Sequence, residues 1–253
     1  MTETASVPPI LELKGIGFAW PDEHGREGAG RAVFSGLDFA LGATDKVGLY
    51  GPNGCGKTTL LRVATGLLAA QAGTVLLDGK PVSGESAFRE LRCAVGFVLQ
   101  NAEDQLFFPE VIEDIAFGPL NLGLSQQEAL RVSRETLASL GLEGFEHRLT
   151  DRLSGGEKKL VSIAAVLAMR PRALLLDEPT TGLDEKAKTR LTEVLTALSI
   201  PRVVVSHDWD FLMAVSDTFA TLEGGRVVAC GRPEVHTHRH VHPMGHVTHS
   251  HGE

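Results

Sequence analysis

The sequence predicts an α/β fold with a helical insertion, and three observations support this prediction. A strand at 47–50, a glycine turn and a helix at 57–68 follow one another as a βα unit. Further short apolar strands follow along the chain, but between residues 105 and 157 helical patterns replace them, for example at 126–140. After Pro233 the chain is polar and rich in histidine, so it cannot bury enough apolar surface to fold alone.

We therefore expect one folded domain over residues 1–233, with a helical subdomain at about 105–157. We expect residues 234–253 to form a disordered tail. Local apolar patterns bounded by turn residues predict the other strands, at 10–20, 32–41, 74–78, 93–98, 173–177 and 202–206, and a hairpin over 218–230 that turns at Gly224–Gly225.

Charge and composition exclude several function classes. The 253 residues include 24 Lys and Arg against 32 Asp and Glu, a formal net charge of −8, which disfavours nucleic acid as a partner. The longest nearly unbroken apolar stretch, Leu160–Met169, has about half of the ~20 residues that a membrane-spanning helix needs. The N-terminus shows no secretory signal pattern. Three widely spaced cysteines, without a CxxC pair, predict free thiols.

A phosphate-binding loop is the first chemical motif. Gly51–Thr58, GPNGCGKT, matches G-x-x-x-x-G-K-[ST] between a strand and a helix. Its glycines let backbone N–H groups surround phosphate, while Lys57 reaches the β- and γ-phosphates and Thr58 can ligate Mg²⁺. We expect nucleoside triphosphate binding by the loop residues Asn53, Gly54, Cys55, Gly56, Lys57, Thr58 and Thr59.

Two adjacent carboxylates end an apolar strand. In Ala173–Pro179, ALLLDEP, the leucines fit a buried strand, so Asp177 and Glu178 lie at its carboxyl end, where doubly wound sheets bind ligands. Asp177 can hold Mg²⁺, directly or through water. Glu178 can polarise the water that attacks the γ-phosphate.

A helix start with two glycines is the third motif. Ser154 and Glu157 form a capping box for a helix that ends before Pro171. Capping does not account for Gly155 and Gly156, because glycine in a first helical turn costs up to about 1 kcal/mol relative to alanine. These glycines permit the backbone to approach an anion closely.

Together these motifs resemble those of ABC-type ATPases. Gly51–Thr58, Leu153–Glu157, Ala173–Glu178 and His207 stand in the order and spacing of the Walker A, signature, Walker B and switch-histidine motifs, and the resemblance covers about residues 10–233. It implies the P-loop NTPase ABC ATPase fold, a RecA-like core with an antiparallel β subdomain and an inserted helical subdomain. It also implies a head-to-tail homodimer around two ATP molecules, in which Ser154, Gly155 and Gly156 of one subunit contact the γ-phosphate held by the other.

The resemblance assigns further roles. Glu178, His207, Gln100 and Lys57 would be catalytic, and Thr58, Gln100 and Asp177 would hold Mg²⁺. Gln100 would also couple this site to a transmembrane partner, and Asp184 would belong to the loop that links the two sites. Trp20 would stack on adenine, where a tyrosine is more usual; the alternative is an aromatic in the core. His207 could alternatively be only a strand-end residue.

The segment Val98–Ser125 is similar to that of energy-coupling-factor (ECF) transporter ATPases, particularly the cobalt and nickel group, in its strings DQLF and IAFGPLNLGL. This similarity implies an ECF transmembrane (T) subunit and a substrate-specific metal-binding membrane subunit as partners. The chain would then lie at the cytoplasmic face of the membrane as a peripheral subunit. Phe107, Phe108 and Phe117 would receive a coupling helix or, alternatively, fill the local core.

The histidine-rich tail bears on the substrate. Alternating histidines place imidazoles on one face of an extended chain, within reach of a shared Ni²⁺, Co²⁺ or Zn²⁺ ion. The histidines concerned are His236, His238, His240, His242, His246, His249 and His251. A solvated tail without function is the alternative.

The sequence therefore favours an ATP-hydrolysing subunit of a cobalt or nickel importer. Both halves of an ATP site are complete in this chain, so a homodimer suffices. An ECF ATPase for a vitamin is an alternative that would not need the histidines. A soluble ABC ATPase acting on nucleic acid or the ribosome would predict tandem cassettes or large basic insertions, and the sequence has neither. A metal-storing protein is disfavoured because every catalytic motif is intact.

Overall fold

A six-stranded sheet forms the centre of the computed structural model, which describes residues 8–22, 24, 30–231, 239–240 and 249–250. Its order is β10-β9-β3-β8-β7-β6, and all neighbouring strands are parallel except the β9–β10 hairpin. The strands are β3 (Lys46–Tyr50), β6 (Val95–Val98), β7 (Ala173–Asp177), β8 (Arg202–Val205), β9 (Thr218–Glu223) and β10 (Arg226–Cys230). The predicted hairpin at Gly224–Gly225 is confirmed.

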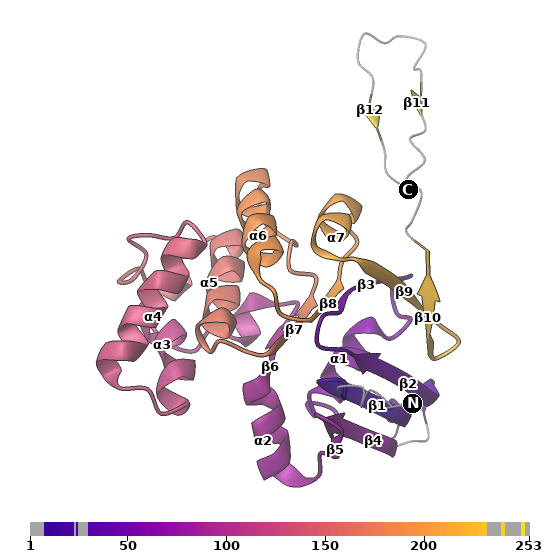
Figure 1. Ribbon diagram of the computed structural model, residues 1–253. Helices are drawn as coiled ribbons and strands as arrows, with labels where there is room; N and C mark the ends of the chain where they lie inside the picture. Colours follow the sequence, from indigo (N-terminus) through magenta and orange to yellow (C-terminus); the bar gives the residue numbers. More distant parts are fainter. Residues whose placement is uncertain (1–7, 23, 25–29, 232–238, 241–248, 251–253) are drawn as a thin grey trace, which may run out of the picture.

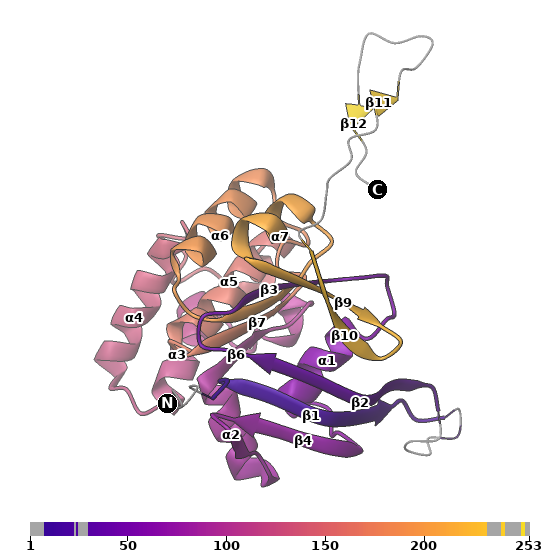
Figure 2. The ribbon, with the colours of Figure 1, turned by 45° about the vertical axis from the view of Figure 1, so that its right-hand side comes forward.

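A second, antiparallel sheet lies beside the first, below it in Figure 2. Its order is β2-β1-β4-β5, from β1 (Leu11–Ala19), β2 (Ala32–Leu41), β4 (Ala72–Leu77) and β5 (Lys80–Pro81). Two short strands near the C-terminus, β11 (Arg239–His240) and β12 (His249–Ser250), pair only with each other in the described part of the chain.

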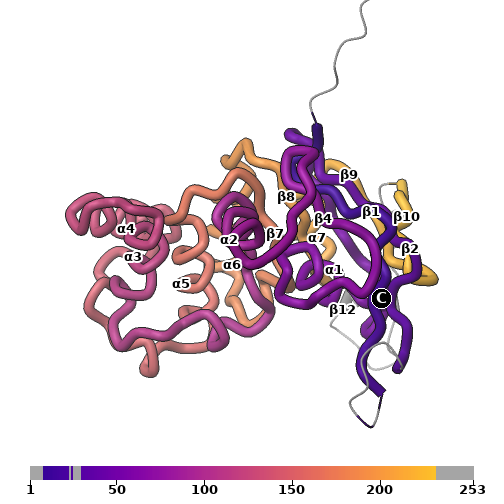
Figure 3. The backbone as a smooth tube through the Cα atoms, turned by 90° about the horizontal axis from the view of Figure 1, so that it is seen from below, coloured from indigo at the N-terminus to yellow at the C-terminus, as the bar shows by residue number. Residues whose placement is uncertain are grey.

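Seven α-helices complete the described fold. They are α1 (Lys57–Ala64), α2 (Gly84–Ala94), α3 (Val111–Asn121), α4 (Gln126–Ser139), α5 (Gly155–Ala168), α6 (Glu185–Ala197) and α7 (Trp209–Val215), with short 3₁₀ turns at Ala102–Asp104 and Thr150–Arg152. Helices α3 and α4 lie at one side of the molecule and the antiparallel strands at the other (Figures 1 and 3). None of the described helices has the length and apolar character needed to span a bilayer.

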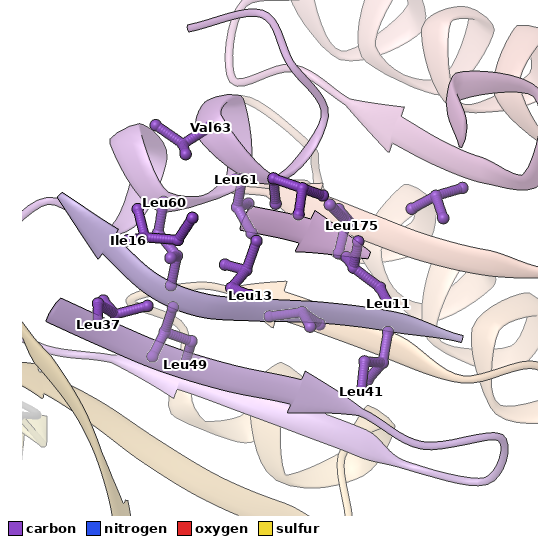
Figure 4. Close-up of a cluster of buried hydrophobic side chains, with 14 of the residues drawn as sticks. Leu11, Leu13, Ile16, Leu37, Leu41, Leu49, Leu60, Leu61, Val63 and Leu175 are labelled. Carbon is purple, nitrogen blue, oxygen red and sulfur yellow. The ribbon is translucent and has the colours of Figure 1, made fainter. Parts of the chain in front are cut away.

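The central sheet is buried on both faces, which is why its strands are nearly continuous apolar runs. Alternate residues of β7 pack in opposite directions: Leu175 joins a core with α1 and the antiparallel sheet, whereas Leu174 and Leu176 join a core with α3 to α7. In Figure 4, Leu60 and Leu61 of α1 lie among side chains of the antiparallel sheet. Helix α1 is therefore held between the two sheets, and this fixes the loop that precedes it.

The predicted strands agree with the structure to within two residues at each end, and two of the differing boundaries have a clear structural cause. Helix α1 ends at Ala64 rather than Leu68, because Gly66 adopts φ = 71° and Leu67 N–H donates to Arg62 O (2.8 Å), a left-handed helix stop. The strand predicted at 93–98 begins only at Val95, since the preceding residues end the unpredicted helix α2. As predicted, all three cysteines are free thiols.

Asp114 in α3 is a buried carboxylate whose ionisation should change the stability of the fold with pH. Its Oδ1 accepts from the backbone N–H groups of Phe107 (2.7 Å) and Phe108 (3.1 Å), while Oδ2 has no hydrogen-bond partner among the described residues. Burial raises the pKa of Asp114 above its ordinary value of 3.8, against the effect of the two N–H groups.

We expect Asp114→Asn to reduce the pH dependence of the free energy of unfolding. Because the folded protein holds this proton more tightly than the unfolded chain, the protonated carboxyl stabilises the fold below about pH 4, and this contribution is lost as the pH rises through the raised pKa. Urea unfolding between pH 4 and 7 should show the variant gaining stability relative to wild type as the pH rises. The exposed Asp151→Asn is the control, and parallel curves for wild type and Asp114→Asn would contradict the assignment.

Candidate functional site

A cavity of about 610 Å³ opens at the carboxyl ends of β3 and β7, where residues from distant parts of the chain meet. It is lined by Trp20, Arg31, Val33, Asn53, Gly54, Gly56, Lys57, Thr58, Thr59, Gln100, Asp177, Glu178, Thr181, Val205 and His207. Of the predicted residues, the structure thus brings together the phosphate loop, both carboxylates, Gln100, His207 and Trp20. Arg31 and Val33 also line it, and no motif in the sequence indicates them. Thr181, a further lining residue, belongs to the string TTGLD that contains Asp184.

The phosphate loop needs glycine at two positions for different reasons. Gly54 adopts φ = 76° with open space around it, so the backbone can approach a ligand. Gly56 adopts φ = 110° just before α1, and a Cβ there would lie 2.6 Å from Val33 Cγ1. Lys57 is 7% exposed, and its Nζ donates to Gly51 O (2.7 Å) and Pro52 O (3.0 Å). The loop backbone thus holds this ammonium group at the cavity.

Cys55 occupies a different place from the other loop residues. It does not line the 610 Å³ cavity but an adjoining one of about 460 Å³, which is also lined by Phe34 and Leu222 and shares Gly54 with the first. Its side chain packs against the core between the sheets. Its Sγ also lies 3.9 Å from Lys57 Nζ. Nucleotide binding by Cys55 stays a prediction.

Asp177 has the surroundings of a cation ligand. The residue is 1% exposed, and within the described structure neither buried carboxylate oxygen makes a hydrogen bond of ordinary geometry. Burial raises the pKa of Asp177, while the Thr58 hydroxyl and the charge of Lys159 lower it. Two buried carboxylate oxygens beside a hydroxyl are the hard oxygen donors that Mg²⁺ prefers, so these residues fit the metal.

Glu178 is held against His207 in an unusual backbone conformation. It adopts φ = 47°, a left-handed conformation that non-glycine residues rarely take, as often found at functional sites. The backbone N–H of His207 donates to Glu178 Oε2 (3.3 Å), and His207 Nε2 lies 3.3 Å from Oε1. Burial raises the pKa of Glu178, while His207 lowers it. A carboxylate oriented in this way at the cavity can accept a proton from an attacking water.

Trp20 and Gln100 lie at the cavity on separate segments. The Trp20 indole is 41% exposed and packs edge-on against Phe18, with ring centroids 5.3 Å apart, so it is not a core aromatic. Gln100 follows β6, and its carbonyl oxygen accepts from Lys159 Nζ (2.8 Å). Gln100 lines the same cavity as the two carboxylates.

The signature residues lie at a second cavity of about 1,100 Å³, which in the described structure shares no lining residue with the first. Ser154, Gly155, Gly156 and Asp184 line it. The predicted capping box is confirmed, since Ser154 Oγ accepts from Glu157 N–H (3.3 Å) and Glu157 Oε2 accepts from Ser154 N–H (2.8 Å). Gly155 faces open space, as close approach of an anion requires.

Gly156 has a packing role that the sequence prediction missed. A Cβ on Gly156 would lie 2.8 Å from the carbonyl oxygen of Gly182. The second signature glycine is therefore needed for the close approach of the loop before α6, whatever it does toward an anion. No local sequence signal could show this, because the two glycines belong to separate segments.

The predicted tail histidines fall largely outside the described residues: His236, His238, His242, His246 and His251 are not among them. His240 and His249 are backbone partners in the register of the β11–β12 ladder. Metal binding by the tail stays a prediction.

Fold and site together define a class of protein. A buried lysine in a phosphate loop, a carboxylate pair at the end of a parallel strand and a histidine against the second carboxylate are the parts of a P-loop nucleoside triphosphatase. The separate signature helix and the antiparallel sheet beside the core are those of an ATP-binding cassette.

Comparison with known proteins identifies the family. The ABC transporter family model matches residues 34–181. A "Putative ABC transporter ATP-binding protein" of Nitratidesulfovibrio vulgaris is 47% identical over 251 residues, 99% of this chain and 89% of that protein. The energy-coupling factor transporter ATP-binding protein EcfA of Methanocaldococcus jannaschii is 39% identical over 229 residues, 89% of this chain and 80% of that protein. The structure of cbiO1 from Clostridium perfringens, part of the ABC transporter complex cbiONQ, superposes with a TM-score of 0.73 at 30% identity and 87% coverage of both chains.

The chain belongs to the ATP-binding proteins of ABC transporters, in their energy-coupling-factor group. It is accordingly an ATPase that binds and hydrolyses ATP.

Proposed function

We propose that this chain is the energy-coupling ATPase of an ECF-type importer for cobalt or nickel ions. It would work with an ECF transmembrane (T) subunit and a substrate-specific metal-binding membrane subunit, at the cytoplasmic face of the membrane. The observation that carries the proposal is the convergence of Lys57, Asp177, Glu178 and His207 on one cavity. The resemblance of Val98–Ser125 to the cobalt and nickel group adds the substrate class.

The residues that line the cavity would each have a different role in hydrolysis. The ammonium of Lys57 and the N–H groups of the phosphate loop bind the β- and γ-phosphates. Thr58, Asp177 and Gln100 would hold Mg²⁺, which when bound neutralises charge on these phosphates. Glu178 accepts the proton of the attacking water, a task that its raised pKa favours. His207 keeps the Glu178 carboxylate in place through the contacts at 3.3 Å.

The separation of the two cavities supports a head-to-tail homodimer. Ser154, Gly155 and Gly156 line a cavity distinct from that of Lys57. A signature helix therefore completes an ATP site on a second chain rather than on its own. With both half-sites intact in one chain, two copies would enclose two ATP molecules.

An exposed apolar surface around α3 supports docking of a membrane subunit. Phe107 is 74% exposed and Phe117 is 49% exposed, and Leu120 and Leu149 are also exposed. The half-buried Phe108 packs against Phe117 with the rings tilted by 47° (centroids 5.3 Å apart) and so supports this surface. Exposed apolar groups of this size mark interaction sites, and a coupling helix from the T subunit is the partner we propose.

Metal uptake in cells that carry the chain with its neighbouring membrane subunits tests the proposal. We expect Co²⁺ or Ni²⁺ to accumulate with wild type and with the exposed control Glu90→Gln, and Glu178→Gln to abolish uptake. A version ending at Pro233 reports whether the tail histidines assist. If neither metal accumulates while the purified protein hydrolyses ATP, the metal assignment is wrong, and the same cells should be tested for vitamin uptake.

A further inference from the structure

A buried lysine joins the signature helix to the segment that carries Gln100. Lys159 lies in α5, three residues after Gly156, and is 2% exposed. Its Nζ donates to the carbonyl oxygens of Leu99 (2.8 Å) and Gln100 (2.8 Å). Burial lowers the pKa of Lys159 to about 8, against the opposing effect of Asp177 and Glu178.

The Gln100 segment needs such a partner because it leaves the sheet. Strand β6 ends at Val98, so the following carbonyls have no strand neighbour to pair with. The side chain of Gln105 braces the strand end: its Oε1 accepts from Leu99 N–H (2.8 Å), and its Nε2 donates to Phe97 O (2.9 Å). Lys159 adds two further hydrogen bonds to this segment, and because the donor is charged they are stronger than bonds from a neutral donor.

The signature turn and the Gln100 segment also face each other directly. A cavity of about 260 Å³ between them is lined by Gln100, Gly155, Lys159 and Thr181, among others. Beside it, Lys158 Nζ contacts Glu103 Oε1 at 2.5 Å. Glu103 is 74% exposed, so this second lysine contact is a surface ion pair of small energetic weight.

We propose that Lys159 is a positioning residue that ties Gln100 to the signature turn of the same chain. The helix that begins at the signature cavity then sets where the Gln100 side chain lies in the nucleotide cavity. If a partner's nucleotide contacts Ser154 or Gly155 and shifts the start of α5, this shift would reach Gln100 through less than two turns of the helix. The inference rests on the role proposed above for Gln100.

Steady-state hydrolysis by purified full-length variants tests it. Lys159→Met keeps the length of the side chain and removes the donor. We expect kcat to fall by about 10- to 100-fold, as for a misplaced reacting group, with KM for ATP changed little. Lys159→Arg, which keeps a charged donor, should recover much of the rate. Lys158→Met, one residue away, should keep the rate of wild type. Thermal unfolding checks that each variant is folded.

A double-variant comparison separates positioning from general structural support. If Lys159 acts through Gln100, then Lys159→Met combined with Gln100→Ala should be no slower than the slower single variant. Multiplied effects, or an unchanged kcat in Lys159→Met, would overturn the inference. If Lys159→Met does not fold, Lys159→Leu, which also removes the donor, carries the same comparison. Wild-type hydrolysis by Gln100→Ala would instead overturn the role proposed for Gln100, and the inference with it.

Discussion

Glu178→Gln is expected to lower the rate of ATP hydrolysis by about 10²- to 10⁴-fold, the typical contribution of a general base. Glutamine keeps the shape of the side chain, and its amide oxygen can still accept from His207 N–H, now 3.3 Å from Glu178 Oε2. It cannot take a proton from water. Because Lys57 and the phosphate loop are unchanged, ATP should still bind, and an ATP-bound dimer should accumulate.

Two measurements check this expectation. Phosphate release gives the rate, and size-exclusion chromatography with ATP gives the dimer. Glu90→Gln makes the same chemical change on the exposed face of α2 and should behave as wild type in both. Wild-type turnover in Glu178→Gln would refute the assignment of the base.

Lys57→Ala is expected to weaken ATP binding by about 10- to 150-fold, because hydrogen bonds to a charged group contribute about 1.5–3 kcal/mol. The change removes the cation beside the β- and γ-phosphates. It also removes the donor to Gly51 O and Pro52 O, which organises the loop in the structure. Part of the lost affinity should therefore come from a less ordered phosphate loop.

Isothermal titration with ATP measures this affinity, and the thermal shift on adding ATP provides a second readout. Wild type should melt at a higher temperature with ATP, and Lys57→Ala should show little shift. Lys80→Ala, on exposed β5 in the antiparallel sheet, removes the same charge away from the cavity and should respond as wild type does. Equal affinity of wild type and Lys57→Ala would show that phosphate binding lies elsewhere.

Much of the fold is predictable from sequence because its strands are short apolar runs between turn residues. Strand β7 and the hairpin at Gly224–Gly225 have the predicted positions. Helix α2 is missed although Phe88, Leu91 and Ala94 recur at helical spacing and pack against the core. It runs directly into β6, so the strand predicted at 93–98 takes in its last residues. The end of α1 depends on the left-handed conformation of Gly66, which an apolar pattern does not reveal.

Some residues of the site are likewise predictable from the sequence and others are not. Lys57, Asp177 and Glu178 belong to contiguous motifs whose strand and helix context is readable, and they meet because the carboxyl ends of parallel strands share one edge. Contacts between segments distant in sequence have no such signal. The bond from Lys159 to Leu99 spans 60 positions, and the close approach of Gly156 to Gly182 joins separate loops.

The left-handed backbone conformation of Glu178 lowers the stability of the fold at a residue that hydrolysis needs. A residue held at φ = 47° costs on the order of 1–3 kcal/mol, and glycine at the same position would be free of most of this cost. The replacement would also remove the carboxylate. Selection of this chain for heat resistance alone would thus favour inactive variants at position 178, so improved stability that keeps activity has to be sought at other positions.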